Sequence, residues 1–158
     1  MIKYAITGNI ACGKSTAEKI LSDNGFKVID TDEIGHKMLD CEEIHNAFKN
    51  FEVFENNKIS REKLGRLVFN NSELKKRLEK IIHPKIRSEI ISFFGQNKNE
   101  KYLFVSIPLV FETGMEDLFD KIIMIYADDE IRLNRLIKRN GYTEEYAKTR
   151  MSCQMNQN

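Results

Sequence analysis

Residues 8–16 read GNIACGKST, which satisfies the pattern G-x-x-x-x-G-K-[ST] of phosphate-binding P-loops. Gly8 and Gly13 allow backbone conformations that other residues avoid, so the loop can approach a phosphate closely. Its N–H groups and the N-terminus of a following helix would face the anion. Lys14 would reach the β- and γ-phosphates of a nucleotide, and the Ser15 hydroxyl would coordinate Mg²⁺. A glycine-rich turn without a ligand would not explain why Lys14 and Ser15 both stand in register.

The flanking segments predict the strand, loop and helix that a P-loop requires. Residues 2–7 read IKYAIT, an apolar run of strand length, and residues 14–24 predict a helix. Residues 26–29 form a second apolar run that leads into Asp30 and Asp32. A strand, a helix and a strand at this spacing predict a parallel pair with a right-handed connection. Both carboxylates would then lie at the carboxyl edge of the sheet, on the same side as the P-loop.

Two carboxylates beside a phosphate site have a chemical use. Asp30 and Asp32 are two residues apart, so they point the same way in an extended chain. One could orient an attacking hydroxyl or accept its proton, and the other could hold the magnesium shell through water. The alternative for Asp32 is a structural role as the N-cap of a helix over residues 33–39.

The next segment of the chain is mostly helical by its apolar spacing. Residues 53–59 are short and polar-ended and predict a turn. Ser60 and Ser72 are predicted to cap the two helices that follow them. Pro84 is predicted to end or kink the second of these helices and to sit in the first turn of another.

This helical segment, residues 33–96, is long for a connection between parallel strands. An ordinary crossover needs about a dozen residues or somewhat more. The insertion therefore predicts a separate lobe that could hold a second substrate. Alternatively, its helices extend the core and bind no ligand.

Two more apolar runs, residues 102–107 and 121–127, predict a third and a fourth strand. A helix then carries Arg132, Arg135 and Arg139, which share one face at spacings i, i+3 and i+7. This basic stripe could be a solvated surface. It could also belong to a lid whose guanidinium groups close over transferring phosphates, and we favour the lid, with Arg135 and Arg139 as its leading residues.

Composition argues against several other classes of protein. The chain of 158 residues suits one domain, and 41% hydrophobic with 31% charged residues indicates a globular protein. A net charge of +1 does not suggest a nucleic-acid partner, and no apolar run predicts a membrane span or a signal peptide. Cys12, Cys41 and Cys153 lack C-x-x-C spacing, which predicts reduced thiols of a cytoplasmic protein and no zinc site.

Six blocks of sequence together resemble the dephospho-CoA kinase family, in that family's order and spacing. They are GNIACGKST, VIDTD, LEKIIHPKIR, SIPLVFE, LNRLIKRNGYT and RMSCQ. The resemblance implies ATP-dependent phosphorylation of the 3′-hydroxyl of the dephospho-CoA ribose, the last step of coenzyme A biosynthesis, with Mg²⁺ as cofactor. It also implies one α/β P-loop kinase domain over residues 1–158, with strand order 2-3-1-4 and helices on both faces, in which residues 33–96 are the CoA-side lobe and residues 128–150 the lid.

The resemblance also assigns residues to roles. Asp32 matches the family's proposed catalytic base, and Arg139 matches the lid arginine that acts with Lys14 in transfer. The remaining predicted residues fall into three groups. ATP would be bound by Gly8, Ala11, Cys12, Gly13, Lys14, Ser15, Thr16 and Arg135, the acceptor by His83, Arg87, Pro108, Leu109, Phe111 and Glu112, and the metal by Ser15.

The chain departs from the family's pattern in three ways. Asn9, Ala11 and Cys12 stand where the family usually has Gly, Gly and Ser, so Ala11 needs a conformation that accepts a Cβ. Ser106 ends the third predicted strand, where many P-loop proteins carry a magnesium-shell Asp. The family also continues beyond residue 158 with a fifth strand.

Two rival functions have similar signatures. One is another small-molecule P-loop kinase, of the nucleoside monophosphate or shikimate type, which would not be expected to carry both the His83-Pro84 and the PLVFE blocks. The other is a nucleotide-binding module without transfer chemistry. The combined presence of four residues argues against it: Lys14, Ser15, Asp32 and Arg139.

Overall fold

The computed structural model describes residues 1–108 and 110–154. They form two compact units. The sheet unit comprises residues 1–30 and the described residues from 97 onward, and the helical unit comprises residues 31–96.

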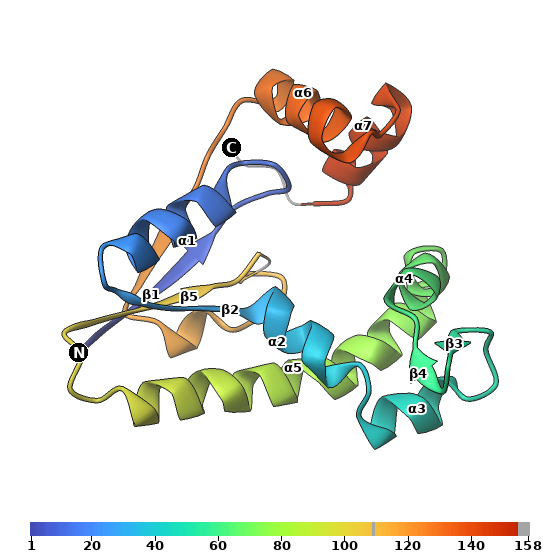
Figure 1. Ribbon diagram of the computed structural model, residues 1–158, viewed down its shortest axis with the longest axis horizontal. Coiled ribbons are helices and arrows are strands. Elements are labelled where there is room, and N and C mark those ends of the chain that lie inside the picture. The colour runs from blue at the N-terminus through green and yellow to red at the C-terminus, as the bar shows by residue number, and fades with distance from the viewer. Residues whose placement is uncertain (109, 155–158) are drawn as a thin grey trace. The chain divides into compact units, whose positions relative to one another are not determined.

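The sheet unit is built on a four-stranded parallel sheet (Figure 1). Its strands are β1 (Ile2–Thr7), β2 (Lys27–Asp30), β5 (Tyr102–Ser106) and β6 (Lys121–Met124). The order is β2-β5-β1-β6, which confirms the α/β class and the predicted strand order. Strand β5 lies between β2 and β1 and is almost entirely buried, as its apolar sequence YLFVS requires.

Register brings the strands' carboxyl ends together. Ser106 pairs with Ile6 of β1 on one side and with Asp30 of β2 on the other. The segments that leave these strands therefore begin at one edge of the sheet, where open α/β folds bind their ligands.

The sheet unit has three helices and one 3₁₀ turn among its described residues. They are α1 (Lys14–Asp23), η1 (Glu116–Leu118), α6 (Asp129–Asn140) and α7 (Glu144–Ser152). Helix α6 ends at Gly141 in a left-handed conformation, and the side chain of Thr143 caps α7 by accepting a hydrogen bond from the Tyr146 N–H. Both signals were predicted from sequence.

The helical unit has four helices and a small hairpin. They are α2 (Thr31–Met38), α3 (Glu42–Phe48), β3 (Phe54–Glu55), β4 (Lys58–Ile59), α4 (Arg61–Phe69) and α5 (Ser72–Gln96). Helices α2, α3 and α4 all pack against the long α5 (Figure 1). The core is apolar and includes the fully buried Ile44 and Phe48 together with Val53 and Leu64.

Three local predictions in this unit were wrong: the turn over residues 53–59, the cap at Ser72 and a helix end at Pro84. Residues 53–59 were predicted as a turn, but they form the β3–β4 hairpin. Asn56 and Asn57 both have left-handed φ values, 49° and 64°, which suit the tight turn of a two-residue hairpin. Ser72 was predicted as an N-cap, but α5 begins at Ser72 and the Asn71 side chain accepts the N–H bonds of the first turn.

Pro84 was predicted to end or kink a helix, yet α5 continues through it as one element. A proline inside a helix costs about 3 kcal/mol or more. Packing on both sides offsets this cost: Ile81 and Ile82 lie against the apolar core, and Ile86 lies beside Gly35 of α2. Tertiary contacts therefore outweigh the local preference of the proline.

None of the helices in the described part of the chain is both long and apolar enough to cross a membrane.

Candidate nucleotide site

The P-loop joins the end of β1 to the start of α1 and is held in an unusual backbone conformation. Gly8, Ala11 and Gly13 all have positive φ, at 154°, 61° and 107°. A Cβ added at Gly8 would lie 2.5 Å from the Ile125 carbonyl oxygen, so only glycine fits there. Ala11 adopts the left-handed conformation that its Cβ makes unfavourable. Interactions from outside the loop must therefore stabilise it.

The predicted phosphate residues lie where α1 begins. Gly13 is the N-cap, Ser15 and Thr16 are exposed in the first turn, and Cys12 is buried. The Lys14 ammonium donates hydrogen bonds to Glu18 Oε1 at 2.9 Å and to Ser106 Oγ at 2.5 Å. The start of α1 thus carries a hydroxyl and a cation at a helix N-terminus, the end of a helix that favours an anion.

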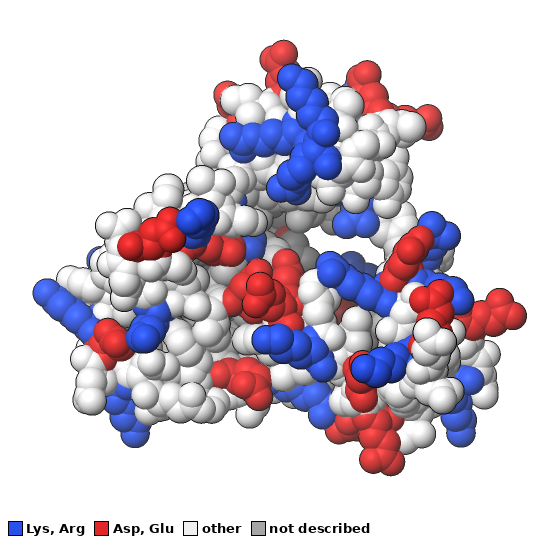
Figure 2. Space-filling model, in the orientation of Figure 1, with Lys and Arg blue, Asp and Glu red and all other residues white. Residues whose placement is uncertain are grey.

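A pocket of about 610 Å³ opens between the P-loop and α6. It is lined by Ala11, Gly13, Thr16, Ile131, Asn134, Arg135, Lys138 and Arg139. Three of the lining side chains are cationic, and Lys and Arg gather over the α6 and α7 part of the surface (Figure 2). Cations opposite helix N–H groups favour a polyanionic ligand such as a triphosphate.

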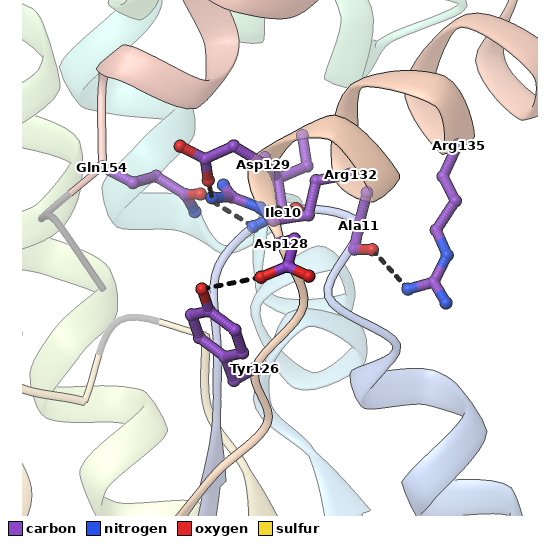
Figure 3. Close-up of polar contacts among 8 residues, drawn as sticks. All are labelled: Ile10, Ala11, Tyr126, Asp128, Asp129, Arg132, Arg135 and Gln154. Atoms are coloured by element: carbon purple, nitrogen blue, oxygen red, sulfur yellow. Dashed lines mark hydrogen bonds and ion pairs between the residues drawn. The ribbon is translucent and has the colours of Figure 1, made fainter. Parts of the chain in front are cut away.

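The predicted lid arginines occupy different environments. Arg135 donates from Nη1 to the Ala11 carbonyl at 3.0 Å, so it bonds the P-loop itself (Figure 3). Arg139 is exposed and donates from Nε to Asn140 Oδ1 at 3.1 Å. Both side chains line the pocket, which distinguishes them from a stripe that faces only solvent.

Arg132 differs from the other two arginines of the predicted basic stripe. Its side chain is only 3% exposed and lies on the buried face of α6 with Leu136, four residues on. Its Nε donates to the Ile10 carbonyl at 2.9 Å and its Nη1 to Asp129 Oδ1 at 2.8 Å (Figure 3). Nη2 is buried and has no hydrogen-bond partner in the described structure. No sequence signal separates Arg132 from the other two arginines, because Arg135 also has an apolar residue, Ile131, four positions away.

The P-loop peptide at Ile10 is therefore held at both ends. Its carbonyl accepts from Arg132, and its N–H donates to Gln154 Oε1 at 2.7 Å. With the Arg135 contact to Ala11, three side chains from the α6–α7 segment hold the left-handed part of the loop. Gln154 ends the RMSCQ block, but the sequence did not predict its role, because only the fold brings it near a residue 144 positions away.

The segment that leads into α6 carries one perturbed group. The Tyr126 hydroxyl donates to Asp128 Oδ1 at 3.0 Å. This hydrogen bond, with the negative charge of Asp128, raises the pKa of Tyr126 above its ordinary value. The phenol therefore stays neutral and acts as a donor.

The predicted acceptor residues are distributed over both units. In the sheet unit, the Pro108 carbonyl accepts a hydrogen bond from Thr7 Oγ1 at 3.1 Å, and Phe111 and Glu112 are exposed. Glu112 was given the alternative of pairing with a lysine, and it makes no ion pair within residues 1–108 and 110–154. Leu109, also predicted here, lies outside the described residues.

The remaining predicted residues belong to the helical unit. Asp32 lies in the first turn of α2 with an exposed side chain, so it is inside the helix rather than its N-cap. His83 and Arg87 lie one turn apart on α5 and are both partly buried. Side chains at this spacing share a helix face and can contact one ligand.

Comparison with known proteins decides the family. The sequence model that describes dephospho-CoA kinase matches residues 2–158. The chain belongs to the dephospho-CoA kinase family. A dephospho-CoA kinase of Campylobacter jejuni strain RM1221 is 41% identical over 159 residues, which cover 96% of this chain and 79% of that protein. The predicted resemblance is thereby confirmed.

Two solved structures match almost the whole chain. The crystal structure of TT1252 from Thermus thermophilus has a TM-score of 0.87 at 32% identity and covers 98% of this chain and 80% of its own. A dephospho-CoA kinase from Campylobacter jejuni has a TM-score of 0.70 at 41% identity, over 96% of this chain and 79% of that one. The chain is accordingly an ATP-dependent kinase of coenzyme A biosynthesis with a P-loop fold.

Proposed function

We propose that this chain transfers the γ-phosphoryl group of ATP to the 3′-hydroxyl of the dephospho-CoA ribose. The hydroxyl oxygen forms a bond to the γ-phosphorus, the bond from that phosphorus to the β–γ bridging oxygen breaks, and ADP leaves. The observation that carries this proposal is the pocket in which Gly13 and Thr16 face Arg135 and Arg139. Phosphoryl transfer needs mainly positioning and charge stabilisation, and that pocket supplies both.

The phosphates are assigned to the P-loop. The N–H groups at the start of α1 bind their oxygens, and Lys14 leaves its present partners to contact the β- and γ-phosphates. Arg135 and Arg139 approach from α6, so we propose that residues 128–150 act as the lid. Planar guanidinium groups can bind two phosphate oxygens at once, which suits a charge that spreads during transfer.

The site's oxygen donors fit Mg²⁺ that enters with the nucleotide. The described residues hold no cluster of three or more His, Cys, Asp or Glu side chains that could form a metal cage. Mg²⁺ does not need one, because it is usually held by few protein oxygens together with substrate phosphates. The exposed Ser15 hydroxyl is the residue proposed to hold it. When bound, Mg²⁺ neutralises the charge of the β- and γ-phosphates.

The acceptor side is assigned to residues of both units. We propose that Asp32 orients the 3′-hydroxyl and takes up its proton, because it follows directly from the carboxyl end of β2 and its side chain is exposed. His83 and Arg87 on α5 and the 108–112 segment would bind the rest of dephospho-CoA. We also assign the helical unit to this substrate and place the reaction in the cytoplasm, in keeping with three free cysteines.

The base assignment is tested by Asp32→Asn. This change keeps the size of the side chain and removes its charge and basicity. We expect turnover with dephospho-CoA to fall by roughly 10²-fold or more, within the range that general-base catalysis supplies, with little change in Mg·ATP affinity. Glu33→Gln is the matched control, because Glu33 is an exposed carboxylate in the same first turn of α2 and should leave turnover unchanged. Unchanged turnover of Asp32→Asn would remove Asp32 from the chemistry, and loss of Mg·ATP binding as well would move it to the magnesium shell.

A further inference from the structure

Lys14 is not an isolated cation. Its ammonium donates to Glu18 Oε1 at 2.9 Å and to Ser106 Oγ at 2.5 Å, and Ser106 Oγ donates to the same Glu18 oxygen at 2.5 Å. The three side chains form a closed ring of contacts, here called the Lys14 ring. The kinase mechanism above uses Lys14 alone and leaves Glu18 and Ser106 without a role.

The Lys14 ring is shielded from water. The side chains of Lys14 and Glu18 are 13% and 16% exposed, and Ser106 is fully buried. The same helix carries a second i, i+4 pair, Lys19 with Asp23, at 2.7 Å and with 74% and 60% exposure. Solvent and salt screen the charges of that exposed pair. The Glu18 carboxylate is screened much less, so its charge affects any ligand that binds Lys14.

Glu18 supplies a carboxylate close to the end of β5. Ser106 ends β5 beside β1, where P-loop NTPases carry the Asp that acts on the metal of the bound nucleotide. In this chain the strand supplies only a hydroxyl. The carboxylate comes instead from α1, one helical turn after Lys14, and contacts that hydroxyl directly. The negative charge is thus retained, but on a different element.

A carboxylate at this place must affect which form of the nucleotide binds. Lys14 has to leave or share Glu18 in order to contact the β- and γ-phosphates, so the phosphates come close to the Glu18 charge. Metal-free ATP would meet like charge there. A divalent cation on the phosphates cancels that repulsion and can bind the carboxylate through water.

We propose that Glu18 makes nucleotide binding depend on the divalent cation, so that it selects Mg·ATP over free ATP. Glu18 is in this account a specificity-determining residue, held in place by Ser106. The inference rests on the nucleotide site proposed above, but it concerns a residue that the phosphoryl-transfer mechanism itself does not require.

The test is equilibrium binding of ATP to the wild-type chain and to Glu18→Gln, once with Mg²⁺ and once with EDTA. The amide keeps the size of the side chain and its hydrogen bond to Ser106 while it removes the charge. We expect Glu18→Gln to bind free ATP about tenfold more tightly than wild type does, since one like-charge contact in a shielded site is removed. Its Mg·ATP affinity should stay within about threefold, so the ratio of the two affinities falls.

Two further variants make the result specific. Asp23→Asn removes the exposed carboxylate of the same helix and should leave the ratio unchanged. The double variant Glu18→Gln with Ser106→Asp returns a carboxylate to the strand end and should restore the ratio. Thermal unfolding of each variant establishes that it is folded.

The inference is overturned if Glu18→Gln has the wild-type ratio, or if it weakens both forms of ATP equally, which would reduce Glu18 to a support for Lys14. These results are distinct from a failure of the proposed function. The wild-type chain could bind Mg·ATP and phosphorylate dephospho-CoA while Glu18→Gln leaves the ratio of Mg·ATP affinity to free-ATP affinity unchanged. In that case only the inference about Glu18 fails. If the wild-type chain binds neither form of ATP, the nucleotide site fails as well.

Discussion

Replacement of Arg132 by Met tests whether helix α6 holds the P-loop in its binding conformation. Met keeps most of the apolar stem and removes the guanidinium, which donates to the Ile10 carbonyl and to Asp129. The Asp129 side chain is 77% exposed, so that ion pair contributes little, at most about 1 kcal/mol. The hydrogen bond to Ile10 is expected to be the stronger of the two interactions, because a hydrogen bond from a charged donor contributes about 1.5–3 kcal/mol to stability.

Stability and binding should respond differently to this substitution. Arg132 is buried and its Nη2 lacks a partner, so removal of the charge relieves a desolvation cost that offsets the lost hydrogen bonds. We therefore expect the free energy of unfolding to change by about 1 kcal/mol or less. The P-loop, however, loses a restraint of about 2 kcal/mol on a strained conformation, which corresponds to about thirtyfold weaker nucleotide binding.

The assay combines denaturant unfolding with equilibrium titration of Mg·ADP. Asp129→Asn is the matched control, because it removes the charge of the exposed partner and leaves the bond from Arg132 to Ile10 in place. It should bind Mg·ADP as wild type does. Wild-type affinity in Arg132→Met, or an equal loss in Asp129→Asn, would refute the argument that the Ile10 contact orders the loop.

Three other predictions follow from single contacts. Arg139→Lys should lower kcat while ATP affinity changes little, since an ammonium cannot reproduce the planar fork, and equal turnover at saturating substrates would make Arg139 a surface residue. Gly8→Ala should abolish nucleotide binding, because its Cβ would lie 2.5 Å from the Ile125 carbonyl oxygen, and a variant that still binds Mg·ADP would contradict this. The hydrogen bond from Lys85 lowers the pKa of Glu43 to about 2, so the stability gained from Glu43 is present above its ordinary pKa of 4.5 and is lost as pH falls toward 2. The stability of Glu43→Gln in acid unfolding should accordingly depend less on pH between pH 4.5 and 2, by a small amount because both side chains are largely exposed. Identical profiles for wild type and variant would mean that the Lys85–Glu43 pair does not contribute to stability.

The sequence was most informative where local pattern and long-range structure agree. Four apolar runs predicted the four parallel strands, and the glycine-rich loop predicted the junction of β1 and α1. Gly141 and Thr143 predicted the end of α6 and the start of α7, since each acts on its own backbone neighbourhood.

The wrong secondary-structure predictions fall where tertiary packing, or a turn with a weak sequence signal, determines the local structure. Pro84 is a strong local signal, but contacts that only the folded helical unit provides hold α5 together around it. Asn56 and Asn57 are weaker turn signals than Asn-Gly, so the hairpin was not recognised.

The nucleotide site illustrates the same limit. Lys14 and its role could be read from one motif, whereas its partner Ser106 is 92 positions away and meets it only through the pairing of β1 with β5. Arg132 was grouped with Arg135 and Arg139 on one basic face, for which a lid was favoured over a solvated surface, because spacing alone does not reveal which arginine faces the core. Glu18 is only four residues after Lys14 in the sequence. Its effect on a ligand depends on how deeply its side chain is buried, which the sequence does not show.

Product analysis tests the assigned phosphoryl transfer. The wild-type chain is incubated with Mg·ATP and dephospho-CoA, and in parallel with AMP or shikimate as acceptor, with Lys14→Ala as the control that removes the phosphate-binding cation. The account predicts one ADP and one coenzyme A, with its phosphate on the ribose 3′-oxygen, for each ATP consumed. It also predicts no product with the other acceptors, and a rate at least 10³-fold lower in Lys14→Ala. ADP release that does not depend on dephospho-CoA, or transfer to AMP or shikimate instead, would contradict it.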